Sequence, residues 1–338
     1  MDRLFRLYLL DFTGIFIIGI AIYFLSFGTN ITVNNEAGWQ FPPSLLNLNT
    51  IFLSILIEAM PFVLIGVLIA GMIQIFVKEE HIQKCIPKNK FLAVMMSCVV
   101  GACFPACECG MVPIVRKLVA KGVPIYAGIG FLLTGPLINP IVIASTYMAF
   151  GNNLKISLLR MIIGFFIAIF VAIAVSFLFK GRQFKETAPL TDVHSHSSDK
   201  HMTFIEKFWS MLKHSIDEFF DMGRYLIIGA FFAAFVQTYL PAKSLLDAGS
   251  GVGSSTLVMM GLAYIMSLCS EADAFIGASF SSIFPTTSIL GFLVFGPMID
   301  LKNTIMMLSV FRTRFVLGVL AIVTISVFTA LMLLHPFM

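Results

Sequence analysis

Apolar runs of about 20 residues recur along the whole chain, and they constrain its fold more than any other feature. The runs lie at roughly 7–27, 48–77, 91–110, 125–150, 156–180, 217–240, 255–270, 286–311 and 314–336. A run of about 20 apolar residues can cross the hydrocarbon core of a bilayer as a helix. Charged residues make up only 12% of the chain, against about 25% in soluble domains. The sequence therefore predicts an all-α polytopic membrane protein, and it excludes a disordered chain, a disulfide-rich secreted module and a nucleic-acid binder.

The first run is predicted to be a retained transmembrane helix. Arg3 and Arg6 precede it, which resembles a signal peptide, but no small-x-small cleavage site follows. Lys and Arg in short loops mark the cytoplasmic side. Residues 1–47 are therefore interpreted as an N-terminal transmembrane helix and an exterior loop. The predicted location is a bacterial inner membrane, with a cytoplasmic N-terminus and an exterior C-terminus.

The region 91–121 is predicted to be a re-entrant hairpin. Basic residues at both of its ends favour the cytoplasm, yet one apolar run separates them. Pro105, Gly110 and Pro113 interrupt that run. A chain that enters, breaks near mid-depth and returns satisfies both observations, because irregular backbone is tolerated there only against protein or a watery cavity.

A polar connection at 181–210 divides the chain into a first repeat, 48–180, and a second repeat, 211–338. This linker is predicted to be cytoplasmic. It contains His194, His196 and His201, which could sample a metal ion. A solvated linker is the preferred interpretation of so short a tract.

The two halves match in sequence. One group of residues matches at an offset of 163 (229 − 66): Glu58, Gly66, Gln74 and Glu108 with Asp221, Gly229, Gln237 and Glu271. A second group matches at an offset of 161 (296 − 135): Pro124, Phe131, Gly135, Pro136 and Asn139 with Pro285, Phe292, Gly296, Pro297 and Asp300. The predicted topology makes the repeats inverted. Inverted repeats with paired Gly/Pro-interrupted segments indicate a secondary transporter with a site near the midplane.

Three of the six cysteines fall within seven residues at the predicted break of the first hairpin. They are Cys103, Cys107 and Cys109, with Glu108 between the last two. Thiolates are soft ligands that suit soft metals and metalloids. Cys107 and Cys109 are therefore the candidate metal or metalloid ligands. The alternative is that cysteine packs as a small hydrophobe, and this is the preferred interpretation for Cys85 and Cys98.

The matching hairpin of the second half contains Cys269, Glu271 and Asp273. Ionisable groups within a membrane are costly and are functional candidates by default. These acids could bind a cation or exchange protons. Equally, the hairpin tip could reach exterior water, where two acids need no explanation.

Two further spans are predicted to be broken helices. Gly135 and Pro136 interrupt one, and Gly296 and Pro297 interrupt its counterpart. Proline removes an intrahelical hydrogen bond, and the freed carbonyls can face a ligand. A plain kink is the alternative, but Asn139 and Asp300 at matching positions favour a binding role.

These residues resemble the arsenical-permease (ArsP-type) family of predicted bacterial permeases. The likeness rests on the runs Cys103–Gly110, Gly135–Pro140 and Gly296–Asp300 and spans roughly 48–336. The resemblance implies an inner-membrane efflux permease. Some members export trivalent organoarsenicals or arsenite, and relatives often sit beside a partner membrane protein. The family's cysteines correspond to Cys107 and Cys109, and also to Cys103.

The prediction is therefore a permease that exports a soft, thiophilic solute by alternating access, coupled to protons. The expected substrate-binding residues are Cys103, Cys107, Glu108, Cys109, Asn139, Cys269, Glu271, Asp273 and Asp300. No catalytic residues and no cofactor are expected. The expected partners are the lipid bilayer, the small solute, a partner membrane protein and a second copy of the chain. The alternatives are a channel with a fixed filter and a membrane component of a metal- or thiol-handling complex.

Overall fold

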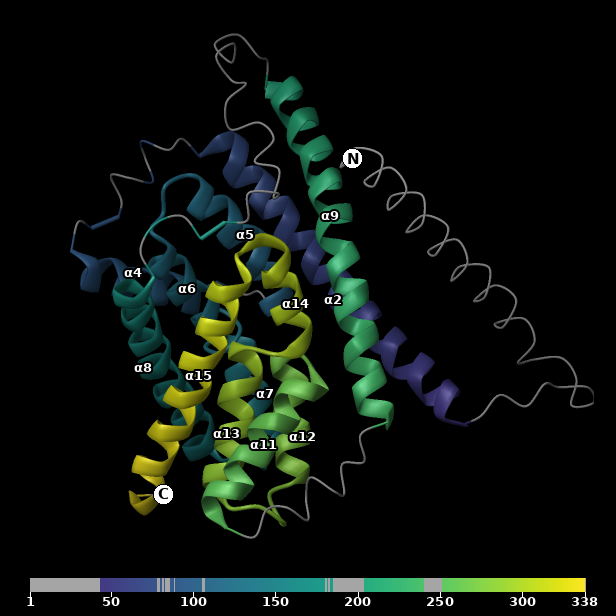
Figure 1. Ribbon diagram of the computed structural model, residues 1–338, viewed down its shortest axis with the longest axis vertical. Coiled ribbons are helices and arrows are strands. Elements are labelled where there is room, and N and C mark those ends of the chain that lie inside the picture. The colour runs from purple at the N-terminus through teal and green to yellow at the C-terminus, as the bar shows by residue number, and fades with distance from the viewer. Residues whose placement is uncertain are drawn as a thin grey trace, which may run out of the picture. The chain divides into compact units, whose positions relative to one another are not determined.

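The computed structural model describes residues 43–77, 80, 82, 86–87, 89–104, 107–179, 181, 183–184, 204–239 and 251–337. The chain divides into two compact units, Met1–Leu46 and Asn47–Met338. All regular elements among the described residues are helical, apart from one isolated bridge between Phe184 and Phe311 (Figure 1). The predicted first helix, Cys85 and the linker histidines lie outside the described residues.

Each predicted apolar run of the first half that the structure describes is helical, and the two predicted breaks are present. The helices are α2 (Pro43–Phe76), α4 (Lys90–Ala102), α5 (Glu108–Ala120), α6 (Ile125–Thr134), α7 (Pro140–Ala149) and α8 (Leu154–Leu178). The region 91–121 forms two short helices, α4 and α5, and the span 125–150 is divided into α6 and α7.

The second half has helices in the same order. They are α9 (Phe204–Tyr239), α11 (Val252–Met266), α12 (Ser270–Ser279), α13 (Thr286–Met298), α14 (Leu301–Val310) and α15 (Thr313–Leu334), followed by the 3₁₀ turn η2 (His335–Phe337). α9 begins at Phe204, inside the segment predicted to be linker. The helix therefore begins before the predicted start of the second repeat at 211. Its first residues include the exposed Ile205, Phe208 and Trp209.

Five helical segments in the described part of the chain are long and apolar enough to cross a membrane. They are Pro43–Phe76, Leu154–Leu178, Phe208–Tyr239, Thr286–Val310 and Thr313–Leu334. The segment Thr286–Val310, which combines α13 and α14, is 89% buried within the protein. The other four are at most half buried. The chain is a multi-pass membrane protein with the broken α13–α14 segment at its centre.

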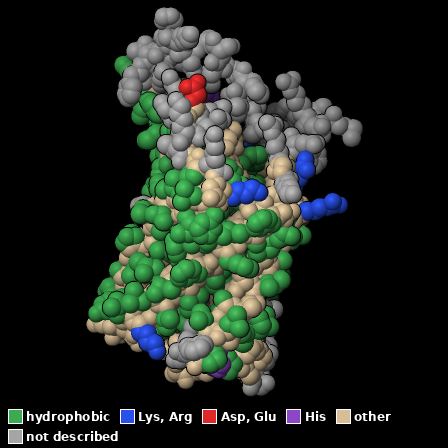
Figure 2. Space-filling model, turned by 90° about the vertical axis from the view of Figure 1, so that its left-hand side faces the viewer, with side chains coloured by type: hydrophobic (Ala, Val, Ile, Leu, Met, Phe, Trp, Pro, Cys, Tyr) green, Lys and Arg blue, Asp and Glu red, His purple; other side chains and the backbone are tan. Residues whose placement is uncertain are grey.

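One face of the protein is almost entirely hydrophobic, as expected for contact with lipid. Figure 2 shows hydrophobic side chains across this face, with Lys and Arg only toward its two ends. On α8, Phe166, Phe170 and Phe177 are each more than 60% exposed. The 25 residues of α8 correspond to about 37 Å, slightly more than the hydrocarbon thickness of about 30 Å.

Two pairs of long helices pack antiparallel. In the first, Phe52 of α2 contacts Phe231 of α9, whereas Ser215 of α9 donates a hydrogen bond to the Val67 carbonyl 3.4 Å away. A later residue of α2 therefore contacts an earlier residue of α9, so the two helices run in opposite directions. In the second pair, Phe179, directly after α8, stacks edge-on against Phe315 near the start of α15. The N-terminal part of α8 shares a groove with the C-terminal part of α15.

Candidate functional site

The candidate site is built where helices begin and end inside the protein. α5 begins at Glu108 after the break at 103–107, and α14 begins directly after Asp300. α11 ends at Met266 and α12 begins at Ser270. Helix N-termini present unpaired N–H groups and partial positive charge. Three such N-termini belong to α5, α12 and α14, where Glu108, Ser270 and Asp300 are buried.

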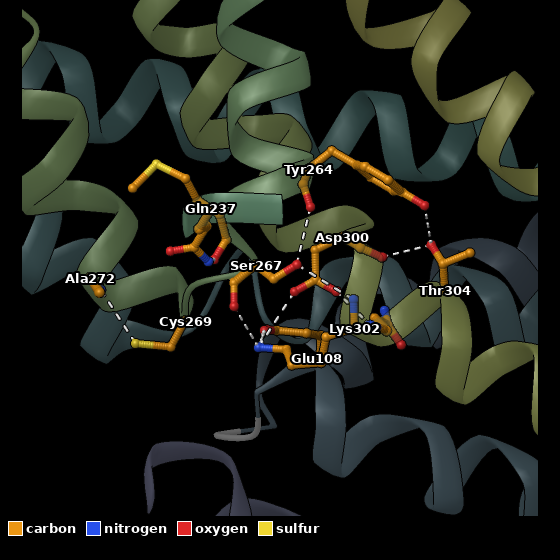
Figure 3. Close-up of polar contacts among 11 residues, drawn as sticks. Glu108, Gln237, Tyr264, Ser267, Cys269, Ala272, Asp300, Lys302 and Thr304 are labelled. Carbon is orange, nitrogen blue, oxygen red and sulfur yellow. Dashed lines mark hydrogen bonds and ion pairs between the residues drawn. The ribbon is translucent and has the colours of Figure 1, made fainter. Parts of the chain in front are cut away.

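Lys302 is the centre of the site and joins the two halves of the chain. Its ammonium lies 3.2 Å from Glu108 Oε1 and 3.4 Å from Asp300 Oδ2, and it donates a hydrogen bond to the Ser267 carbonyl at 3.0 Å. Figure 3 shows the Glu108, Asp300 and Lys302 side chains turned toward one another. Each of these three residues is at most 4% exposed. Buried charges are tolerated when they are paired in this way.

Backbone geometry supports the Lys302 contact. Ser267 closes α11 in the left-handed region, with φ of 47°, which is uncommon for a residue other than glycine. That turn directs its carbonyl to Lys302. Ser267 lies at the break between α11 and α12. Strained backbone is concentrated at functional sites, so this position fits a role in the site.

Asp300 also organises the start of α14. Its Oδ1 accepts a hydrogen bond from the Asn303 N–H at 2.5 Å, and its carbonyl accepts from the Thr304 hydroxyl at 2.6 Å. The Tyr264 hydroxyl donates to Thr304 at 3.2 Å (Figure 3). The side-chain amide of Asn303 is fully buried and has no hydrogen-bond partner among the residues that the structure describes.

Arg160 forms a second basic centre beside the tip of α12. It is 2% exposed, and it donates to the Thr146 hydroxyl at 2.6 Å and to the Ser270 carbonyl at 3.0 Å. Arg160 belongs to the first half and donates a hydrogen bond to a backbone carbonyl of the second. Lys302 belongs to the second half and pairs with Glu108 of the first. Each half therefore supplies one buried base to the other.

The third buried acid of the site is Asp273 in the first turn of α12. It is 1% exposed, and neither of its carboxyl oxygens has a hydrogen-bond partner among the described residues. It interacts electrostatically with Arg160, Glu108, Asp300 and Lys302. A Cβ added at Gly296 would lie 2.8 Å from its Oδ2, so glycine leaves the space that the carboxyl group fills.

The predicted cysteines do not all come together. Cys107 and Cys109 are buried, and Lys302 interacts electrostatically with both. Cys103 closes α4 and is exposed. Cys269 caps α12, where its sulfur accepts from the Ala272 N–H at 3.4 Å (Figure 3), and it interacts electrostatically with Glu58 of α2.

The other predicted site residues occupy the helix starts. Asn139 is 4% exposed and caps α7, with Oδ1 accepting from the Ile141 N–H at 3.0 Å. Asp300 caps α14 at the matching position. Glu271 lies in the first turn of α12 and is partly exposed. Among the described residues, no three His, Cys, Asp or Glu side chains are placed to hold a metal ion.

The helix breaks differ in part from those predicted. α6 ends at Thr134, so Gly135 and Pro136 do interrupt that span. Gly110, in contrast, lies inside α5. Its role is close packing, since a Cβ there would lie 2.7 Å from the Phe62 carbonyl.

The predicted break at Gly296 and Pro297 is displaced. Both residues lie in the last turn of α13, which ends at Met298. Pro297 removes only its own backbone hydrogen bond within α13, and the chain leaves the helix at Ile299 and Asp300. Pro105 lies outside the described residues.

Lys302 and Arg160 are site residues that the sequence pattern did not predict. Each is a basic residue inside a long apolar run, which is itself the signal of a functional intramembrane residue. Lys302 lies two positions after Asp300 and outside the matched pattern. Arg160 has no counterpart in the second half.

Comparisons with known proteins agree with these features. The profile of the family ArsP_1, described as "Predicted permease", matches residues 44–336. The protein named "UPF0718 protein YcgR" of Bacillus subtilis is 49% identical over 284 residues, covering 84% of this chain and 95% of that protein. A Streptococcus mutans protein named "Putative two-component membrane permease complex subunit" is 44% identical over 278 residues, covering 82% and 91%. No solved structure matches the chain.

Proposed function

The chain belongs to the ArsP_1 family of predicted permeases, and from this premise we propose that it is a secondary transporter whose substrate binds between the tips of two hairpins, α4–α5 and α11–α12. The transport cycle is alternating access between two states of similar energy. The observation that carries the proposal is the buried contact of Lys302 with Glu108. It joins helix ends from the two halves of the chain inside a membrane protein.

The arrangement of the helices supports two inverted repeats, 48–180 and 211–338. α2, α4, α5, α6, α7 and α8 correspond in order to α9, α11, α12, α13, α14 and α15. The corresponding helices α2 and α9 pack antiparallel, as do α8 and α15. Repeats of opposite orientation produce such a pattern, and they place broken helices at a common site near the midplane. In this interpretation, α4–α5 and α11–α12 are re-entrant hairpins.

The chemistry at the tip of α5 supports a soft, thiophilic solute. Two buried thiols, Cys107 and Cys109, lie at the start of α5, and Lys302 interacts electrostatically with both. Thiolates bind soft metals and metalloids, and a trivalent arsenical is one solute of this class. We propose efflux coupled to protons, with Asn139, Cys269, Glu271, Asp273 and Asp300 as polar contacts along the path. Cys103 is exposed and is proposed only as an entry contact.

The name of the Streptococcus mutans relative suggests that transport requires a second protein. That relative is named a subunit of a two-component membrane permease complex. We extend this to the present chain as a second proposal, in which a partner membrane protein completes the permease. Expression with and without the protein of a neighbouring gene distinguishes a self-sufficient carrier from one that needs its partner.

Transport into everted membrane vesicles tests the proposal directly. The probes are arsenite and a trivalent methylated arsenical, each with and without an imposed proton gradient. We expect saturable uptake that the Cys107→Ser, Cys109→Ser double variant loses at least tenfold. The matched control is Cys98→Ala, a buried cysteine of α4 that packs among apolar side chains outside the proposed path and is expected to transport nearly as well as the parent.

Two outcomes would contradict this proposal. If the double variant transports as well as the parent, the thiols do not bind the solute. If flux does not saturate and single-channel currents appear, the hairpins form a fixed pore and not an alternating carrier.

A further inference from the structure

The buried charges around the site do not balance. Three acids (Glu108, Asp273 and Asp300) face two bases (Lys302 and Arg160), and each of the five is at most 4% exposed. Fully ionised, the cluster has one more negative charge than positive. An unpaired charge in a low-dielectric interior is costly by several kcal/mol or more. The cluster therefore takes up one further positive charge.

The existing contacts show where that charge is missing. Lys302 is shared by Glu108, Asp300 and the Ser267 carbonyl. Arg160 is directed to Thr146 and to the Ser270 carbonyl. Glu108 and Asp300 each form an ion pair with Lys302, whereas both buried carboxyl oxygens of Asp273 have neither an ion pair nor a hydrogen-bond partner among the described residues.

The space around Asp273 suits a proton better than a metal cation. Its Oδ2 is so close to Gly296 that an added Cβ would lie 2.8 Å away. α12 packs against α7 and α13, and neither helix contains Asp, Glu, Lys, Arg, His or Cys. The charged groups that act on Asp273 from other elements are Arg160, Glu108, Asp300 and Lys302, and Glu271 lies on its own helix.

We infer that Asp273 carries a proton in this state and is the group whose loading and unloading couples transport to the proton gradient. This deepens the proposed function, and it assigns one proton to each cycle. The O–H bond forms with a proton from water on one side of the membrane and breaks to water on the other, with no change in oxidation state. Arg160 is the partner that favours release, because its Nε is buried and has no hydrogen-bond partner in the described part of the chain. A small movement of α12 that brings Asp273 to this N–H stabilises the carboxylate.

Infrared difference spectroscopy tests the inference without any transported solute. The full chain is reconstituted in phosphatidylcholine vesicles, and spectra are compared across a pH jump. We expect a protonated carboxyl C=O band near neutral pH that Asp273→Asn removes. Glu271→Gln, a neighbour on the same helix that is partly exposed, is expected to retain the band. Asp273→Glu, which keeps an acid, is expected to shift it.

The possible results separate the alternatives. A band unchanged in Asp273→Asn would overturn the inference. If that variant does not fold, an unshifted band in Asp273→Glu would overturn it equally. A band lost on adding sodium chloride at constant pH would assign the site to a sodium ion instead. If the infrared results are as expected but the cysteine variants transport normally, the proton site stands and the thiol site is wrong.

Discussion

The outer helices α2 and α9 hold corresponding places in the two halves, yet they pack on different partners. A Cβ added at Gly66 of α2 would lie 2.3 Å from the Gly110 carbonyl in α5. A Cβ added at the matching Gly229 of α9 would lie 3.2 Å from Lys302 Cα in α14. In the first half, Ile141 is the counterpart of Lys302 (302 − 161 = 141). It is 58% exposed, against 4% for Lys302.

This difference is what a carrier made of two similar halves requires. If both halves had the same internal packing, the protein would be symmetric and open equally to both sides. α2 packs against the hairpin helix α5 of its own half, whereas α9 packs against the broken helix α14 of its own half. The two halves therefore differ in their internal packing. Exchange of these arrangements between the halves gives the opposite state. The structure therefore represents one end of the proposed cycle.

The largest expected effect comes from breaking the contact between the halves. Lys302→Met leaves Glu108 and Asp300 buried without their base, and removal of one partner from a buried ion pair costs about 3–5 kcal/mol. We expect a strong fall in the unfolding temperature of detergent-solubilised protein and loss of transport. Lys155→Met, at the exposed start of α8, is the control and is expected to be nearly neutral.

A second substitution separates charge from packing in this result. Adding Glu108→Gln to Lys302→Met is expected to restore part of the stability, because one of the two stranded carboxylates is removed. If the double variant is as unstable as Lys302→Met alone, the lysine stabilises mainly by packing. The link between the halves would then not be electrostatic.

The two glycines give the next largest effect and test the comparison itself. Gly66→Ala forces backbone atoms of α2 and α5 apart, and overpacking of this kind costs about 1–3 kcal/mol. Gly229→Ala meets its neighbours at 3.2 Å and beyond, so we expect a smaller loss. Gly223→Ala, with nothing within 4 Å of the new Cβ, is the control for helix propensity. Equal losses at Gly66 and Gly229 in thermal unfolding would show that the two packings do not differ.

Much of this fold could be predicted from the sequence, because hydrophobic length and proline are local signals. The interruption of 125–150 at Gly135 follows from Pro136, which cannot continue the hydrogen-bonding ladder. Caps are also local: Asn139 and Asp300 both begin helices, as short polar side chains do. The breaks at Gly110 and Gly296 were wrong because glycine has two uses. Both of these residues lie within helices and allow close approach.

The ion-pair network could not be predicted, because it depends on which helix ends meet in space. Lys302 and Glu108 are far apart in the sequence, and no periodicity relates them. Arg160 lies in an apolar run that is otherwise typical of a lipid-facing helix. A basic residue within such a run indicates function, but the sequence alone does not identify its partner.

The far ends of the two hairpins also differ. On α5, Arg116 and Lys117 lie 2.7 and 2.8 Å from the Glu218 carboxylate of α9. Lys121, just after α5, donates to the carbonyls of Ile73, Gln74 and Val77 at the end of α2. α12 ends in neutral residues, Ser279 to Ser282. The first hairpin is therefore tied to both outer helices, which favours the second as the one that moves more easily.

The smallest expected effect comes from weakening the ion pairs between α5 and α9. Glu218→Gln keeps the shape of the side chain and one acceptor oxygen but removes the negative charge that pairs with Arg116 and Lys117. We expect a loss of about 0.5–1.5 kcal/mol, the net contribution of a typical hydrogen bond. Amide hydrogen exchange is expected to quicken in the last turn of α5 and to remain unchanged in α12. Asp221→Asn is the control, because Asp221 pairs with Arg224 on its own helix with 42% of its side chain exposed, and such pairs contribute about 0–1 kcal/mol. If the amides of α12 exchange more slowly than those of α5 in the unaltered protein, the first hairpin is the more mobile one and the assignment is reversed. The contacts of α5 with α2 and α9 would then belong to the less stable hairpin.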